Sequence, residues 1–131
     1  MKNVLISTGG TGGHVIPALN INDHLSNIFN TYIVTDLRGI KFIDKNKYKF
    51  EVIETPKFPS SLTKYPIYFF LIIYSLVKSF LYLKKKKIHY LISTGGYMSI
   101  PLCMSAKILG INIYLFEPNK VLGKSNKLIL R

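Results

Sequence analysis

Gly9-Gly10-Thr11-Gly12-Gly13-His14 follows the apolar run Val4–Ile6 and leads into a segment whose apolar residues have helical spacing. A second glycine turn, Thr94-Gly95-Gly96-Tyr97, stands in the same position after Ile88–Ser93. A glycine turn that leads into a helix N-terminus favours phosphate, because N–H groups without intrahelical partners point outward and the helix dipole adds partial positive charge. Glycine permits both the turn and the close approach of a ligand. The two turns therefore predict a site for a nucleotide-sugar or a lipid diphosphate.

The residues around these turns alternate between expected strands and expected helices. Helices are indicated by apolar residues at i, i+3 and i+4, and strands by short apolar runs that end in turn residues. Hairpin signals are few, so this order predicts an α/β fold, Rossmann-like and doubly wound, with a mainly parallel sheet. The expected strands are 4–6, 31–35, 50–53, 88–93 and 111–116, the expected helices are 14–27, 38–45, 66–83 and 99–109, a loop covers 55–65, and a further helix begins after residue 123.

The edge of the sheet at the carboxyl ends of the strands is where such folds bind ligands. Both glycine turns fall at that edge, and so does Glu117-Pro118-Asn119 after the last expected strand. The first turn is not a full dinucleotide fingerprint, because Val15 stands where the third glycine is needed, and it is not a P-loop. Asp36 ends the second expected strand, at the position where dinucleotide enzymes hold a ribose, but without the fingerprint this carries little weight.

Composition limits the classes of partner. A chain of 131 residues that is 48% hydrophobic forms one domain with a core and is not disordered. Its 18 Lys and Arg residues against 6 Asp and Glu give a formal charge of +12, which favours anionic partners such as phosphorylated substrates, acidic lipid or nucleic acid. Nucleic acid is supported by charge alone, since no helix-turn-helix, zinc ligand set or aromatic platform is present, and we expect no nucleic-acid partner.

Histidine and cysteine give few chemical candidates. His14, at a helix start, can act as a packing or capping residue, or it can accept a proton from a sugar hydroxyl near neutral pH. His24 and His89 have no partners at ligand or triad spacing, and we expect no metal site. Cys103 lies in an apolar helical stretch, which predicts a buried structural thiol in a reducing compartment. The N-terminal residues show no signal-peptide pattern.

Pro66–Leu83 is apolar apart from two serines and Lys78, and the run Lys84, Lys85, Lys86 and Lys87 follows it. Its length is at the lower limit for a membrane span, and a lysine inside a span costs free energy. The α/β order requires a connecting helix here, so we expect a helix partly buried on the sheet. Its surplus apolar face and the four lysines are expected to dock on an anionic membrane surface. The alternative is a lysine run that is only a solvated helix end.

Four blocks of sequence together resemble the MurG family, the membrane-associated N-acetylglucosaminyltransferases of peptidoglycan synthesis. Their order and spacing match the family and span nearly the entire chain. The blocks are Gly9 to Ala18, Gly95 to Pro101, Ala106 to Ile111 and Glu117 to Asn126.

The resemblance implies the N-terminal half of a GT-B glycosyltransferase. Residues 1–131 would be a family 28 type N-terminal domain that binds the lipid-linked acceptor, without the C-terminal donor-binding domain. The reaction implied is inverting transfer of GlcNAc from UDP-GlcNAc to an undecaprenyl-diphosphate-linked muramoyl-pentapeptide, with no cofactor. It would take place at the cytoplasmic face of the bacterial inner membrane, with the protein bound peripherally.

The resemblance also implies roles for individual residues. His14 would be the general base for the acceptor hydroxyl. From the residues themselves, Glu117 could contact sugar or orient its loop by accepting backbone N–H groups. Thr94, Tyr97 and Ser99 could touch the lipid diphosphate, and Tyr97 could equally be a packing residue. The remaining substrate-binding residues implied are Thr11, Gly12, Gly13 and Asn119, toward the donor, with Gly95, Gly96 and Tyr97 in the second turn.

One block departs from the family pattern. Phe116 and Pro118 stand where the family has histidine and glutamine, and proline lacks a backbone donor. This departure leaves open a second hypothesis, a non-catalytic membrane-anchoring or recruitment subunit of a split glycosyltransferase. In that case a separate C-terminal chain would bring the donor site.

Overall fold

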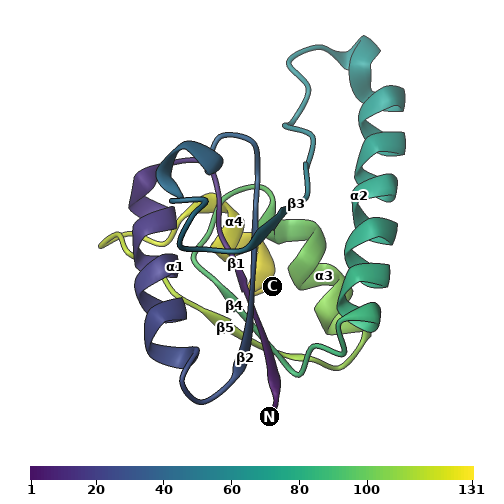
Figure 1. Ribbon diagram of the computed structural model, residues 1–131. Coiled ribbons are helices and arrows are strands. Elements are labelled where there is room, and N and C mark those ends of the chain that lie inside the picture. Colours follow the sequence, from purple (N-terminus) through teal and green to yellow (C-terminus); the bar gives the residue numbers. More distant parts are fainter.

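The computed structural model describes residues 1–131 and contains one five-stranded sheet in the order β3-β2-β1-β4-β5 (Figure 1). Every neighbouring pair of strands is parallel. The fold class predicted from the sequence is therefore confirmed, and the observed strands lie within two residues of the expected ones. The strands are β1 (Asn3–Ser7), β2 (Asn30–Thr35), β3 (Phe50–Val52), β4 (Tyr90–Ser93) and β5 (Asn112–Leu115).

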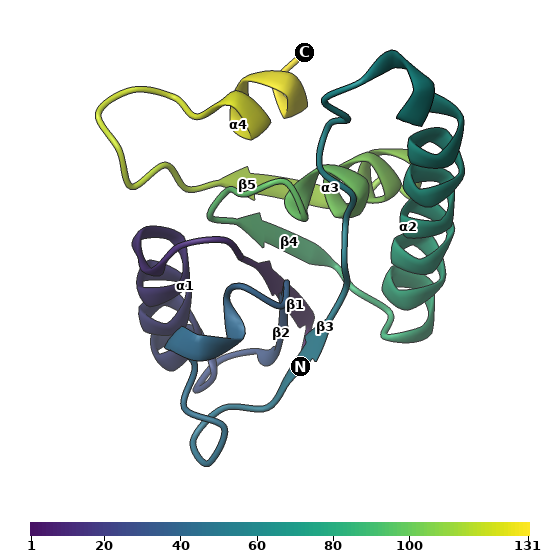
Figure 2. The ribbon, with the colours of Figure 1, turned by 90° about the horizontal axis from the view of Figure 1, so that it is seen from above.

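Helices cover both faces of the sheet, because successive side chains of a strand point to opposite faces. In β1, Val4 and Ile6 pack with Ala18 of α1 on one face, whereas Leu5 packs with Leu102 of α3 on the other. Figure 2 shows α1 and α3 on opposite sides of the sheet. The helices are α1 (Gly12–Leu25), α2 (Tyr65–Lys85), α3 (Ser99–Ile108) and α4 (Lys124–Ile129), with single 3₁₀ turns η1 (Ile40–Phe42) and η2 (Leu62–Lys64).

The helix expected over 38–45 is wrong. Only the 3₁₀ turn η1 forms there, between two stretches of turn. The Asp36 carboxylate accepts a hydrogen bond from the Gly39 N–H at 2.8 Å, and such local side-chain bonds favour turns over helix.

The order of the strands reverses between β1 and β4. From β1 the chain moves outward through β2 to β3, and then returns to add β4 and β5 on the other side of β1. Such a switch point is the usual ligand crevice of a parallel sheet. Both glycine turns leave the carboxyl ends of these two adjacent strands, as the sequence predicts, and they touch: a Cβ built on Gly96 would lie 3.1 Å from the Gly9 carbonyl oxygen.

The long helix α2 packs mainly on α3, and its C-terminal end reaches the core beside the sheet at Tyr82 and Leu83, which narrows the expectation for 66–83. Its buried residues are Ser75, Ser79 and Leu83, from the middle of the helix onward. The Ser75 hydroxyl donates to the Glu54 carbonyl, and the Ser105 hydroxyl of α3 donates to the Leu76 carbonyl. By length and composition alone, Leu62–Lys85 could cross a membrane, with a mean hydropathy of 1.7 over its most apolar window.

The serines at the contact let α2 and α3 approach closely. With 21 residues, α2 is about 31 Å long, which is longer than the strands beside it. The N-terminal half of α2 therefore rises past the carboxyl edge of the sheet with no buried residue of its own (Figure 1).

The four lysines expected to dock on a membrane differ in their contacts and exposure. Lys86 turns toward the body, where its Nζ lies 3.3 Å from the Glu51 carboxylate and over the Tyr32 and Tyr82 rings. Lys84, Lys85 and Lys87 are exposed. The docking role of the four lysines stays a prediction, and Lys86 differs from the other three in being half-buried and facing the Glu51 carboxylate.

Candidate functional site

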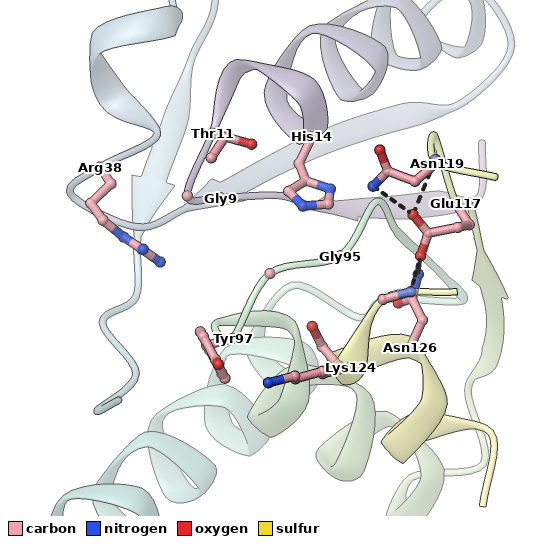
Figure 3. Close-up of a pocket in the computed structure, with 14 residues that line it drawn as sticks. Gly9, Thr11, His14, Arg38, Gly95, Tyr97, Glu117, Asn119, Lys124 and Asn126 are labelled. Carbon is pink, nitrogen blue, oxygen red and sulfur yellow. Dashed lines mark hydrogen bonds between the residues drawn. The ribbon is translucent and has the colours of Figure 1, made fainter. Parts of the chain in front are cut away.

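A cavity of about 270 Å³ opens at the switch point between β1 and β4. Polar and glycine residues line it almost entirely, and Tyr97 is its one aromatic residue. Figure 3 shows His14 and Asn119 across the cavity from Tyr97 and Lys124, with Arg38 at one end. The lining residues are Gly9, Gly10, Thr11, His14, Arg38, Gly95, Gly96, Tyr97, Glu117, Asn119, Gly123, Lys124, Ser125 and Asn126.

The first glycine turn is held by the Asp36 carboxylate. One oxygen accepts the Gly10 N–H at 2.9 Å and the Gly39 N–H at 2.8 Å, and the other accepts the Arg38 guanidinium, also at 2.9 Å. Burial raises the pKa of Asp36, but the two backbone donors and the guanidinium outweigh it and hold this pKa below its ordinary value. Asp36 is only 4% exposed and does not line the cavity, which corrects the tentative ribose-binding assignment. Its role is structural.

The His14 ring bridges the two glycine turns. Its Nδ1 lies 2.7 Å from the Thr94 carbonyl oxygen, which can only accept a hydrogen bond. In the neutral ring, Nδ1 therefore carries the proton and Nε2 carries the lone pair. Gly95 lies against this ring, since a Cβ built on it would be 3.1 Å from the ring Cε1. Glycine is required at position 95 for two reasons: a Cβ would crowd the His14 ring, and the backbone φ of +101° is one that other residues rarely adopt.

The second turn divides into buried and open residues. The hydroxyls of Thr94 and Ser99 are buried, and they donate to the Thr8 hydroxyl and the Gly95 carbonyl, both at 2.8 Å. These two hydroxyls do not reach the cavity, which corrects the expectation that they touch a diphosphate. Gly95, Gly96 and Tyr97 do line it.

Gly12 and Gly13 lie in the first turn of α1 and are not among the lining residues. The Phe42 ring covers Gly12, at 3.1 Å from a Cβ built there. The backbone amides of both glycines nevertheless donate to no group of the chain, as is usual at a helix N-terminus. Any contact of these two residues with a ligand would therefore be made by backbone N–H groups at the start of α1.

The Glu117 carboxylate organises the segment between β5 and α4. One oxygen accepts the backbone and side-chain N–H groups of Asn119, and the other accepts the Gly123 N–H at 2.7 Å and the Asn126 amide at 3.0 Å (Figure 3). The Gly123 N–H bond is the main cause that lowers the pKa of Glu117. Of the two roles left open by the sequence, these contacts match the orientation of the loop. Asn119 is exposed beside it and keeps its side-chain oxygen free of this carboxylate.

The two departures from the family pattern lie outside the cavity. Phe116 and Pro118 alternate with Glu117 and Asn119 along an extended segment, and neither lines the cavity. Glu117 and Asn119, the two residues of this segment that match the family pattern, do line the cavity.

Two cationic residues of the cavity were not predicted from the sequence. Arg38 follows the carboxyl end of β2, and Lys124 is the first residue of α4. Both are exposed. Position could have identified Arg38, a basic residue just beyond the carboxyl end of β2, at the edge that binds ligands. Lys124 comes well after the end of β5, and only the tertiary structure brings it to the cavity. The structure contains no group of three or more His, Cys, Asp or Glu residues that could hold a metal.

The chain matches the family model of the glycosyltransferase family 28 N-terminal domain over residues 4–131. A protein of Pelagibacter ubique, named UDP-N-acetylglucosamine--N-acetylmuramyl-(pentapeptide) pyrophosphoryl-undecaprenol N-acetylglucosamine transferase, is 48% identical over 98% of this chain. A protein of the same name from Caldicellulosiruptor saccharolyticus is 33% identical over 98% of it. The chain spans 36% of the length of each of these relatives.

Among solved structures, the crystal structure of Acinetobacter baumannii MurG matches 99% of this chain with a TM-score of 0.84, at 22% identity. The chain covers 39% of that structure. The fold is therefore that of the N-terminal domain of a GT-B glycosyltransferase. With the match to the family model over almost its whole length, the chain belongs to the glycosyltransferase family 28 N-terminal domain family.

Proposed function

We propose that this chain is the acceptor-binding, membrane-docking half of an N-acetylglucosaminyltransferase of peptidoglycan synthesis. The reaction is transfer of GlcNAc from UDP-GlcNAc to an undecaprenyl-diphosphate-linked muramoyl-pentapeptide, at the cytoplasmic face of the bacterial inner membrane. The observation that carries the proposal is His14, held between two touching glycine turns with Nε2 free. The names of the relatives supply the donor and acceptor classes.

His14 acts as the general base in this proposal. The acceptor hydroxyl attacks the anomeric carbon of GlcNAc, its proton passes to Nε2 of His14, and the bond from that carbon to UDP breaks with inversion. The Thr94 carbonyl supports this role, because its bond to Nδ1–H places the lone pair of the neutral ring on Nε2 and stabilises the imidazolium that forms. General bases of this kind contribute about 10²–10⁴ in rate.

The glycine turns offer backbone N–H groups for the oxygens of two diphosphates. The Tyr97 amide, at the cavity, has no acceptor in the chain and is assigned to the diphosphate of the lipid-linked acceptor. The amides of Gly12 and Gly13 also have no acceptor; they lie outside the cavity at the start of α1 and are assigned to the diphosphate of UDP-GlcNAc. Arg38, which pairs with Asp36, and Lys124 are the basic side chains of the cavity. Helix N-termini and basic side chains together favour bound phosphate groups. The lining residues Asn119 and Thr11 are assigned to the donor side, toward a C-terminal domain.

The exposed stripe of α2 is the proposed membrane surface. Ile67, Phe70, Tyr74 and Leu81 are each more than half exposed and recur at helical spacing on one side, and the stripe ends at Lys84 and Lys85. Such a face lies in the headgroup region of a bilayer, and lysines beside it are attracted to anionic lipid. A peripheral helix also keeps β3 and β4, which α2 connects, in the same sheet.

Transfer is tested by co-expressing the chain with a MurG-type C-terminal domain. Incorporation of labelled GlcNAc into lipid-linked acceptor is then measured. The His14→Ala variant should lose about 10²–10⁴ in rate. His24→Ala is the matched control, because His24 is exposed on the same helix and bonds only the Asn20 carbonyl. Full activity of His14→Ala would remove the general base from the mechanism.

Membrane docking is tested separately by vesicle flotation. Replacing Ile67, Phe70 and Tyr74 by serine should release the chain from all vesicles, whereas Lys84→Ser with Lys85→Ser should weaken binding to anionic vesicles only. The control of equal charge is Lys41→Ser with Lys45→Ser, two exposed lysines far from α2 in sequence. Equal losses in both lysine pairs would show that net charge, and not this surface, governs binding.

A further inference from the structure

Three aromatic rings connect the cavity to the exposed half of α2. The Tyr97 ring, which lines the cavity, meets the Phe58 ring edge to face, with centroids 6.0 Å apart. The Phe58 ring in turn stacks on Tyr68 of α2 at 5.6 Å. These residues come from three separate parts of the chain: the loop after β3, the helix α2 and the turn after β4.

The Phe58 ring is unusually open for an aromatic residue at the centre of a cluster. It is 59% exposed although it contacts a ring on either side. Leu62, Tyr65 and Phe69 are also about half exposed or more, on the part of α2 and η2 that rises past the sheet. The three rings therefore lead from the rim of a polar, cationic cavity to the N-terminal half of α2.

We propose that Tyr97, Phe58 and Tyr68 form a track for the first isoprene units of a polyprenyl diphosphate whose diphosphate group occupies the cavity. The proposal rests on the proposed function and deepens it by assigning a subsite to the lipid part of the acceptor. An amphiphile with a diphosphate head and a branched hydrocarbon tail matches the change from polar to apolar lining. Flat aromatic rings suit the tail, because they offer a large apolar area with little side-chain entropy to lose.

The test compares two probes in buffer without vesicles or detergent. Equilibrium binding of the intact chain is measured with inorganic diphosphate and with farnesyl diphosphate, which carries three isoprene units. We expect farnesyl diphosphate to bind at least tenfold more tightly. In Phe58→Ser this advantage should fall at least fivefold, while the affinity for inorganic diphosphate stays within twofold. Phe58→Leu, which keeps an apolar side chain, should retain most of the advantage.

Ile28→Ser is the matched control. Ile28 is 63% exposed, but it lies between α1 and β2, at the edge of the sheet opposite the cavity. It should change neither affinity. Circular dichroism of each variant checks that the fold is retained.

Each contrary outcome has a distinct meaning. If both probes bind equally well, the track is refuted and the diphosphate site of the proposed function stands. If neither probe binds, both the track and the diphosphate site are refuted. If Phe58→Ser weakens both probes by the same factor, Phe58 only supports the turn at Tyr97. If Ile28→Ser also removes the advantage, the tail binds apolar surface in general, and the proposal fails.

Discussion

Replacing Gly95 by alanine should displace the His14 ring from its position at the cavity. The new Cβ would lie 3.1 Å from Cε1 and 3.2 Å from Nδ1 of His14, closer than ordinary contacts. The ring must therefore move by a few tenths of an ångström or turn away from the Thr94 carbonyl. The backbone φ of +101° is also one that alanine rarely adopts.

The magnitude follows from these two effects. A strained backbone of this kind costs about 1–3 kcal/mol. Loss of the hydrogen bond between the ring and Thr94 costs about 1 kcal/mol more. We therefore expect the free energy of unfolding to fall by about 2–4 kcal/mol. If the domain carries a C-terminal partner, GlcNAc transfer should fall as well, because Nε2 moves.

The assay is urea denaturation followed by circular dichroism, with two controls. Gly110→Ala introduces the same methyl group at a φ of +69°, where nothing lies within 4 Å, so it measures a backbone cost of about 1–2 kcal/mol alone. A double-mutant cycle with His14→Ala isolates the ring contact, because Gly95→Ala should cost about 1 kcal/mol less once the ring is gone. If Gly95→Ala costs no more than Gly110→Ala, and the cycle shows no coupling, the argument that Gly95 positions His14 is wrong.

Three further predictions concern titratable groups. Asp36→Asn should lower the free energy of unfolding by about 2 kcal/mol at pH 7, because the backbone donors and the guanidinium lower the folded-state pKa of Asp36 despite its burial. This stabilisation is present above the unfolded-state pKa and is lost as the pH falls through the folded-state pKa. Denaturation curves of the variant and the wild type should therefore converge below about pH 4. The Gly123 amide resonance should titrate with Glu117 at a midpoint below the ordinary glutamate pKa, and this step should vanish in Glu117→Gln; a midpoint at or above the ordinary value would contradict the bond. Burial raises the pKa of Cys103 to about 12, so the thiol should react with a disulfide reagent at pH 8 only after unfolding, and labelling of the native chain would show that it is accessible.

Local sequence was sufficient for the fold because the signals were local. Short apolar runs that end in glycine turns and lead into helically spaced segments allow few arrangements other than a parallel sheet. Gly95 and Gly96 adopt positive φ, which glycine does without steric cost, so a glycine pair after a strand predicts a turn, and parallel strands bring all their carboxyl ends to one edge. The edge that carries the cavity could therefore be predicted, together with most of the residues that line it.

The expectations that the structure changes are those that depend on packing between distant parts of the chain. Nothing in the run Lys84–Lys87 indicates that Lys86 turns inward, because its partner Glu51 lies on a strand from another part of the chain. The apolar composition of α2 likewise did not indicate that serines would pack it on α3 and leave its N-terminal half without a covering element.

The sequence by itself determined that two glycine turns open helices at the same edge of a parallel sheet, since glycine content, apolar spacing and strand polarity are properties of neighbouring residues. Only the tertiary structure decided what each polar group does there. Asp36 anchors a turn and does not hold a ribose, and His14 has its free nitrogen chosen by a carbonyl 80 residues away. The physical reason is that a side chain's hydrogen-bond partner depends on which groups folding brings within about 3 Å, and separation along the chain does not encode that distance.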